Sequence, residues 1–136
     1  MARRSQKSKR DFITILSIKS LVNQAKVTFV GIGDIGWNAP LHESGFINDK
    51  EITELMELGA VGEVAGWAYD KHGVLLKKGT NTRIAGVPLE QPVQRLTIGV
   101  AGGIHKTDAI LAALKGKLID GLLTDETVAE SILQMI

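Results

Sequence analysis

The chain has 136 residues, of which 44% are hydrophobic, so it is long enough to form one globular domain with a core and too short for two. It contains no cysteine, which excludes disulfides, thiolate metal sites and cysteine nucleophiles and favours a cytoplasmic location. Sixteen Lys and Arg residues stand against 15 Asp and Glu, but five of the basic residues lie in residues 3–10, which leaves a charge of −4 on residues 11–136. This balance argues against a nucleic-acid-binding surface on the folded part.

The first residues predict a tail followed by a helix and a strand. Residues 1–11 are basic and have almost nothing apolar to bury, so we expect a disordered leader there. The apolar stretch at 12–16 is too short for a signal peptide or a membrane span. Apolar residues at helical spacing predict a helix over residues 13–24, and a run rich in Val, Phe and Ile predicts a buried strand over 26–32.

A glycine-rich loop follows this strand. Gly31, Gly33 and Gly36 have the spacing of a dinucleotide-binding turn, but Pro40 and its neighbours follow where that motif requires a helix, so we do not predict a dinucleotide site. Asp34 lies in the same loop, just after the C-terminal end of a strand. Open α/β sheets bind ligands at such ends, which makes Asp34 a candidate ligand-binding residue.

The remaining elements alternate between helix and strand. A helix is predicted over residues 49–58, with Asn48 or Asp49 as its cap, and a hairpin-like pair over 61–69 and 74–77 that reverses at 71–73. A strand over 95–101, a helix over 107–114, a strand over 119–124 and a final helix capped by Thr124 or Asp125 complete the chain. This order indicates parallel pairing, so the predicted fold is α/β, with an open, mainly parallel sheet flanked by helices.

The turn between the last two predicted strands is the strongest candidate for an anion site. Gly102 and Gly103 allow a sharp turn at the start of a helix, where backbone amides point outward at the positive end of the helix dipole. Lys106 adds a full charge, and His105 lies beside it. A phosphate group is the expected guest; the alternative is a glycine-rich turn that carries an exposed lysine.

Neither a metal nor a cofactor is expected. His42, His72 and His105 are separated by 30 and 33 residues, without the paired spacing of metal ligands. Asp125 and Glu126 could be paired catalytic carboxylates, but they follow Thr124 at a helix start, where acids stabilise the dipole.

Six short blocks, taken together and in order, resemble the C-terminal sugar-binding region of the SorC family of bacterial transcriptional regulators. They are Val-Gly-Ile-Gly at 30–33, Ser-Gly-Phe-Ile at 44–47, Gly-Ala-Val-Gly-Glu-Val at 59–64, Tyr-Asp at 69–70, Val-Ala-Gly-Gly-Ile-His-Lys at 100–106 and Leu-Thr-Asp-Glu at 123–126. The resemblance implies a fold similar to the ribose-phosphate isomerase and glucosamine-phosphate deaminase (NagB/RpiA-like) group. It also implies that Glu63 meets the hydroxyls of the effector and that Lys106 meets its phosphate.

The sequence lacks the helix-turn-helix and the phosphate loop that the resemblance leads us to expect in a full-length member. We therefore expect residues 12–136 to be the C-terminal part of an effector domain that binds a phosphorylated sugar or a related small molecule. DNA binding would need a helix-turn-helix from outside this chain. A partial sheet exposes an apolar face or an edge, so a homo-oligomer is expected. The alternatives are a sugar-phosphate isomerase or deaminase and a remnant without activity.

Overall fold

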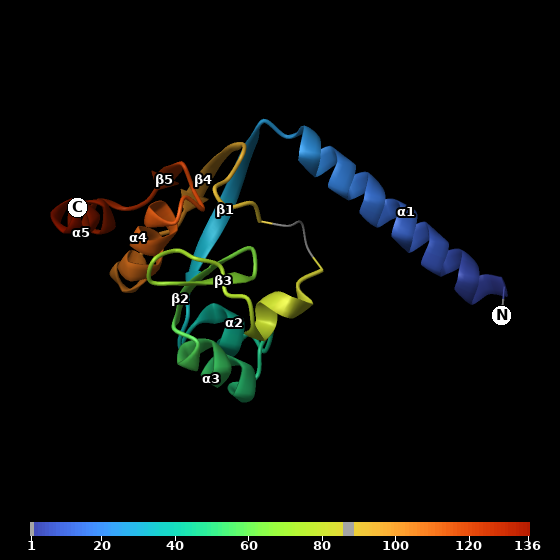
Figure 1. Cartoon of the computed structure of the whole chain (residues 1–136), viewed down its shortest axis with the longest axis horizontal. Helices are drawn as coiled ribbons and strands as arrows, with labels where there is room; N and C mark the ends of the chain where they lie inside the picture. The colour runs from blue at the N-terminus through green and yellow to red at the C-terminus, as the bar shows by residue number, and fades with distance from the viewer. Residues whose placement is uncertain (1, 86–88) are drawn as a thin grey trace.

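The computed structural model describes residues 2–85 and 89–136 and contains a mixed five-stranded sheet in the order β3-β2-β1-β4-β5 (Figure 1). The central strand β1 (Val27–Asp34) pairs in parallel with β4 (Leu96–Val100), which pairs in parallel with β5 (Gly121–Leu123). On its other side, β1 pairs antiparallel with β2 (Ala60–Val64), which pairs antiparallel with β3 (Trp67–Asp70). The α/β class is confirmed, and the parallel pairing predicted for most of the sheet is found in one half of it.

The antiparallel half differs from the predicted hairpin in the place of its turn. Residues 61–69, expected as one strand, are divided by Ala65 and Gly66, whose φ angles are +51° and +86°. Two successive residues with positive φ match the right-handed twist of a hairpin, so the chain reverses there. A second turn at 70–73 follows, but the expected return strand over 74–77 makes only one bridge, between Tyr69 and Leu75.

The predicted helix starts are confirmed where a cap residue marks them. Helix α3 (Asp49–Glu57) begins after Asn48, which exchanges hydrogen bonds with Glu51 in a capping box. Asp125 is the cap of α5 (Glu126–Met135), and its carboxylate accepts from the Val128 amide at 2.9 Å. Besides the N-terminal helix α1, the other helical elements are α2 (Pro40–Glu43), α4 (Thr107–Lys115) and two short 3-10 turns, η1 (Gly79–Arg83) and η2 (Ile104–Lys106).

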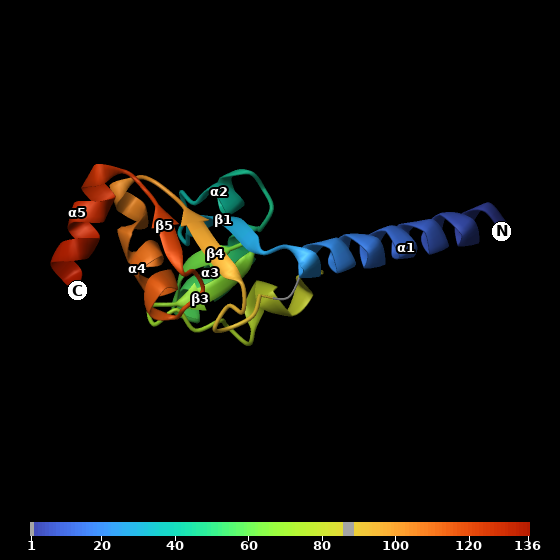
Figure 2. The same cartoon turned by 90° about the horizontal axis from the view of Figure 1, so that it is seen from above.

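Helix α1 (Ala2–Gln24) includes the residues expected to be a disordered leader. The sequence of residues 2–11 holds neither Pro nor Gly and is rich in Arg and Lys, which favour helix, so the helix predicted from residue 13 starts eleven positions earlier. In both views α1 runs away from the body of the molecule, and the two termini lie at opposite ends (Figures 1 and 2). The division of the chain into a leader and a domain at residue 11 stays a prediction.

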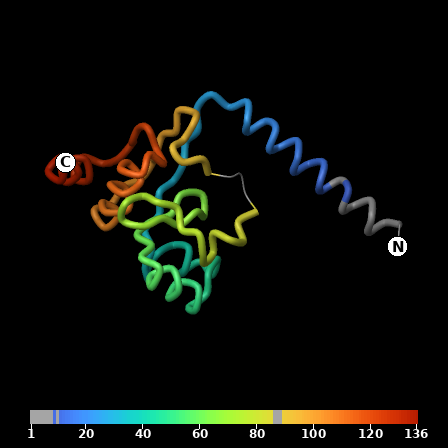
Figure 3. Tube along the Cα trace, viewed as in Figure 1, coloured from blue at the N-terminus to red at the C-terminus, as the bar shows by residue number. Residues whose placement is uncertain are grey.

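The core lies on both sides of the antiparallel half of the sheet. Helix α4 covers one face and α5 packs against α4, so that Ile32, Val64, Tyr69, Ile110 and Val128 are buried together. Helix α3 covers β2 and β3 from the other side in a smaller cluster that includes Ile52 and Leu55. The trace in Figure 3 shows α4 and α5 grouped at the end of the molecule opposite α1. No described helix has the length and the hydropathy that crossing a membrane requires.

The hydroxyl of Tyr69 connects the two halves of the fold. It donates a hydrogen bond of 2.9 Å to the carbonyl oxygen of Ala109 in α4, and the whole side chain is buried. Burial raises the pKa of Tyr69, because the ionised phenolate would lose its hydration. Gly62 makes this contact possible, since a Cβ at that position would overlap the Tyr69 ring and come within 2.8 Å of the Ala109 Cβ.

Substitution Gly62→Ala is therefore expected to destabilise the fold by about 1–3 kcal/mol, the usual cost of overpacking a filled core. Urea unfolding followed by circular dichroism measures this loss. Gly31→Ala is the matched control, because Gly31 lies in the neighbouring strand and no described atom lies within 4 Å of its added Cβ. Equal unfolding midpoints for the two variants would show that Gly62 is not needed for this contact.

Candidate functional site

A hollow of about 430 Å³ lies at the C-terminal end of β1. Its floor is formed by residues 31–34, and its walls come from α2, the β2–β3 turn and the end of β4. Asp34, Glu63 and Lys106, three of the six predicted ligand-binding residues, line this hollow together. They come from β1, from β2 and from the residue that precedes α4, so the sheet topology brings together residues that are up to 72 positions apart.

Glu63 is held in place by the β2–β3 turn and by the absence of a side chain at Gly33. Its Oε2 accepts a hydrogen bond of 2.7 Å from the Gly66 amide, and its carboxylate lies where a Cβ at Gly33 would be. Partial burial raises the pKa of Glu63, while the Gly66 amide and the charge of Lys106 act in the opposite direction. One oxygen remains to accept from a ligand hydroxyl, because the Gly66 bond uses only Oε2.

Lys106 reaches across the end of β1. Its Nζ donates a hydrogen bond of 3.1 Å to the carbonyl oxygen of Ile32, and its side chain is half-buried. An ammonium group has three donors, so this bond orients the lysine and leaves donors for an anion or a hydroxyl in the hollow.

Asp34 carries an unpaired polar atom. Its Oδ1 is buried and has no hydrogen-bond partner among the described residues. A buried acceptor without a donor costs about 1–3 kcal/mol, which makes this oxygen a candidate partner for a ligand hydroxyl.

The predicted anion turn has a different arrangement. Gly103, with φ at +99°, donates its amide to Oδ2 of Asp125 at 2.7 Å, so a carboxylate of the protein occupies the donor expected to hold a phosphate. The hydrogen bonds from Gly103 and Val128 lower the pKa of Asp125. Gly102, Gly103 and His105 are not among the residues that line the hollow, and only Lys106 of this turn reaches it. Asp125 thus has a second partner that its role as a helix cap does not indicate.

A second hollow, of about 390 Å³, adjoins the first and shares Leu41, Glu63 and Gly66 with it. Arg83 lines this second hollow and pairs with Glu51 of α3, and no motif around Arg83 predicts this position. Asn81 is buried nearby, and its side chain bonds to both backbone groups of Ala68 and to the carbonyl oxygen of Leu76. These three bonds fix η1 against β3, so Asn81 holds Arg83 in position.

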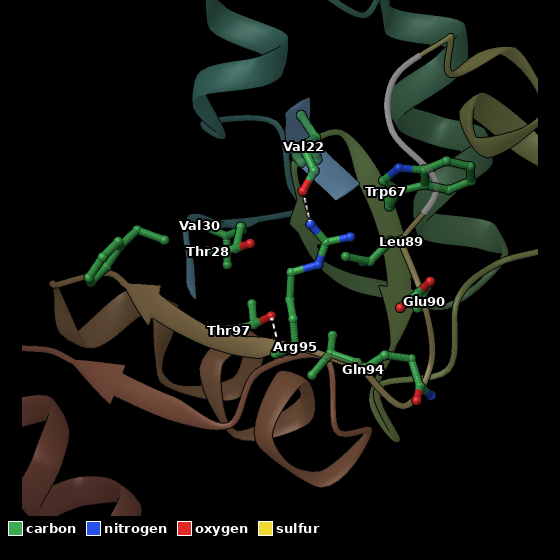
Figure 4. Close-up of a pocket in the computed structure, with 12 residues that line it drawn as sticks. Val22, Thr28, Val30, Trp67, Leu89, Glu90, Gln94, Arg95 and Thr97 are labelled. Carbon is green, nitrogen blue, oxygen red and sulfur yellow. Dashed lines mark hydrogen bonds between the residues drawn. The ribbon is translucent and has the colours of Figure 1, made fainter. Parts of the chain in front are cut away.

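His42 and Trp67 do not line the first hollow. His42 bonds to Asp49 and to the carbonyl oxygen of Trp37, each at 2.8 Å, and thereby joins α2 to α3; the Asp49 carboxylate raises the pKa of His42. Trp67 lines a mainly apolar pocket of about 300 Å³ near the start of β1 (Figure 4). In this pocket the guanidinium of Arg95 donates a hydrogen bond to the carbonyl oxygen of Val22 at the end of α1.

Comparison with known proteins identifies the class of protein to which this chain belongs. Residues 5–134 match the Sugar-bind family model of sugar-binding domains. The erythritol catabolism regulatory protein EryD of Brucella abortus is 34% identical over 110 residues, and the transcriptional regulator LsrR of Enterobacter sp. (strain 638) is 38% identical over 115. These matches cover 81% and 82% of this chain and 35% and 36% of the relatives, so the chain spans about a third of the length of the curated relatives it matches.

A similar fold occurs in the full-length sorbitol operon regulator SorC of Klebsiella pneumoniae, with a TM-score of 0.79 and 27% identity. That match covers 88% of this chain and 39% of the regulator. The chain belongs to the family of sugar-binding domains found in SorC-type and LsrR-type transcriptional regulators. The resemblance seen in the six sequence blocks is confirmed.

The raised pKa of Glu63 predicts a pH dependence of stability. The unfolded state ionises at the ordinary pKa of 4.5, before the folded state does, so the contribution of Glu63 is fully present below pH 4.5 and is lost as the pH rises through its higher folded pKa. Glu63→Gln cannot ionise and does not lose this contribution. The variant is therefore expected to gain stability relative to the natural protein between about pH 4 and about pH 7, so that the difference in unfolding free energy (variant minus natural protein), measured by urea unfolding, is more positive at the higher pH. The same difference at both would contradict the expected burial of the charge.

Proposed function

We propose that this domain binds a phosphorylated sugar or sugar alcohol in the hollow at the end of β1 and does not transform it chemically. The observation that carries the proposal is the convergence of Asp34, Glu63 and Lys106 in one hollow, with an unpaired oxygen on Asp34. Carboxylate oxygens accept hydrogen bonds from sugar hydroxyls, and an ammonium group pairs with a phosphate. A volume of about 430 Å³ lies within the range of pockets that hold small molecules.

The relatives support a polyol ligand class. The name of EryD refers to erythritol catabolism, and SorC is described as a sorbitol operon regulator. Erythritol and sorbitol are linear chains of hydroxyl groups, which suit two carboxylates that line one hollow. Their phosphates would place the charged group at Lys106. In a longer regulator, binding of such an effector would control transcription, and DNA contacts would be made outside the part described here.

We assign Gly102, Gly103 and His105 roles that differ from the direct anion binding expected from the sequence. The Asp125 carboxylate occupies the Gly103 amide and thereby fixes the turn that carries Lys106. We propose that Gly102 and Gly103 act by shaping this turn and that His105, exposed on its surface, contributes a weak contact to a phosphate beside Lys106.

Lys106→Ala is expected to weaken binding of sorbitol 6-phosphate by about 1.5–3 kcal/mol, or roughly 10-fold to 150-fold, because it removes a charge-assisted hydrogen bond. Isothermal titration calorimetry with sorbitol 6-phosphate and erythritol 4-phosphate measures the effect, and sorbitol itself serves as the uncharged comparison. Lys115→Ala, at the far end of α4, is the matched control.

An equal loss of affinity for sorbitol and for its phosphate would contradict the assignment of the phosphate to Lys106. Conversion of either phosphate by the natural protein, followed by NMR, would overturn the proposal of a binding module and favour a sugar-phosphate isomerase or deaminase. Asp34→Asn and Glu63→Gln are expected to weaken both the phosphorylated and the uncharged ligand, because both carboxylates are assigned to hydroxyl groups.

A further inference from the structure

Helix α2 forms part of the wall of the first hollow, and one side chain links this wall to α3. Pro40 and Leu41 of α2 line the hollow. The next residue, His42, does not line it, and its ring bonds instead to Asp49, the first residue of α3. Among the described residues, the other hydrogen bonds of α2 join positions within 37–47. The bond between His42 and Asp49 is therefore the polar link between the wall and α3.

The ring of His42 lies between two hydrogen-bond acceptors. Its Nδ1 is 2.8 Å from the carbonyl oxygen of Trp37, and its Nε2 is 2.8 Å from Oδ1 of Asp49. A carbonyl group and an ionised carboxylate can only accept, and a neutral imidazole has a single N–H, so only the imidazolium can donate to both. Loss of the proton turns one of the two bonds into a contact between lone pairs. The geometry itself thus favours the charged form of His42.

The surroundings of His42 act in the same direction. Among the described residues, the charged groups that face the ring are Asp49 on α3 and Glu43 on α2, and both are acids. The hydrogen bonds to Asp49 and to the Trp37 carbonyl raise the pKa of His42 above its ordinary 6.5, against the opposing effect of burial. The Trp37 ring also meets the imidazole edge to face, with 5.2 Å between the ring centres. The indole thereby limits the orientations that the imidazole can adopt.

We propose that His42 is a positioning residue for the candidate site and that its proton holds α2 against α3. The charged ring bonds to Trp37 and to Asp49 at once and keeps the wall of the hollow in place. The neutral ring loses one of these bonds, which frees α2 to move relative to α3. An effector that contacts this wall would therefore bind less tightly as the pH rises and His42 loses its proton. This last step rests on the proposed function, whereas the link between the helices does not.

The direction of the raised pKa sets the range of pH in which the link is lost. The unfolded chain titrates His42 at the ordinary 6.5 and the folded chain above it, so the contribution of the link is fully present below pH 6.5 and disappears as the pH rises through the folded value. Glu63 also titrates in the site, and a phosphate monoester has a second pKa of about 6. A comparison of the natural protein with variants of His42 and Asp49 therefore isolates the contribution of this pair.

An NMR titration of the three histidines tests the link without an effector. The His42 signal is assigned by its absence in His42→Gln, and its midpoint in the natural protein is expected above 6.5. Asp49→Asn is expected to lower this midpoint, because an amide can donate to Nε2 and thereby satisfy the neutral ring. His72→Gln, in the exposed turn at 70–73, is the matched control and should leave the midpoint unchanged. A midpoint no higher in the natural protein than in Asp49→Asn would overturn the proposal.

Hydrogen exchange measures whether α2 loosens when His42 is neutral. The amides of Gly45 and Ile47 donate to the carbonyl oxygens of His42 and Leu41 and so report on this segment. Their protection factors, corrected for the pH dependence of intrinsic exchange, are expected to fall at least about fivefold between about pH 6 and about pH 9 in the natural protein. The protection factors of His42→Gln, which cannot titrate, are expected to stay constant. The same change in both proteins would contradict a role for the His42 proton.

Calorimetry with sorbitol 6-phosphate tests the effect on the candidate site. Between about pH 6 and about pH 9 the affinity of the natural protein is expected to fall at least about fivefold more than that of His42→Gln. Asp49→Asn is expected to retain its affinity at the higher pH, because its neutral ring keeps both bonds, and a merely structural aspartate would show no such rescue. Binding is reciprocal, so a saturating effector should raise the pKa of His42 by the logarithm of the same factor.

Two outcomes of the calorimetry separate this inference from the proposed function. Identical pH profiles for the natural protein and His42→Gln would overturn the control of the site by His42, while the proposed function would stand. No binding by the natural protein at either pH would overturn the proposed function together with the step that depends on an effector. The NMR titration and the exchange measurements then still decide whether the His42 proton holds α2 against α3.

Discussion

The hydrogen bond between Tyr69 and Ala109 is the interaction on which the rest of the fold depends. It joins the antiparallel half, through β3, to α4, which packs beneath the centre of the sheet. Glu63 is next to Gly62, the glycine that makes room for the tyrosine, and Lys106 directly precedes α4. The same contact therefore sets the position of two charged residues that face the hollow from opposite halves of the sheet.

The parts of the fold predicted best from the sequence were those that local residues determine. Asn48 and Asp125 mark their helices because a side chain at the cap accepts from an amide three residues later. The β2–β3 turn was missed because Ala65 is not a residue expected to adopt positive φ, and the apolar residues on either side of it continue without a polar break. Residues 2–11 form a helix although their sequence has neither a cap residue nor an apolar face that would predict one.

The candidate site could be predicted only in part, for a different reason. Asp34 follows from its place at the end of a strand, and Glu63 and Lys106 follow from the resemblance to sugar-binding regulators. The Gly102–Gly103 turn was assigned to an anion because its local sequence leaves amides free. The Gly103 amide instead donates to Asp125, which lies 22 residues further along the chain. A contact between residues so far apart leaves no pattern in the local sequence. Arg83 was missed because Asn81, which holds it in place, acts through backbone groups of β3.

The expected exposure of an apolar surface has a precise location in the structure. Five apolar side chains on one face of β1, β4 and β5 are 43–66% exposed, namely Val27, Phe29, Leu96, Val100 and Leu123, and Val100 also lines the hollow. Whatever covers this face also forms a wall of the candidate site.

The pairing of β1 has a consequence for the synthesis of this chain. Its antiparallel partner β2 follows closely, with Ile32 opposite Val64, but its parallel partner β4 is 69 positions away, with Val27 opposite Leu96. At about 5–20 residues per second, the ribosome needs roughly 2–6 s to make the 31 residues between the end of β2 and the start of β4. During that interval the antiparallel half and α3 can form while the other edge of β1 has no strand to pair with. The nascent chain therefore presents an apolar strand edge for seconds. Chaperones bind surfaces of this kind, and without them the edge would pair with another nascent chain on the same mRNA.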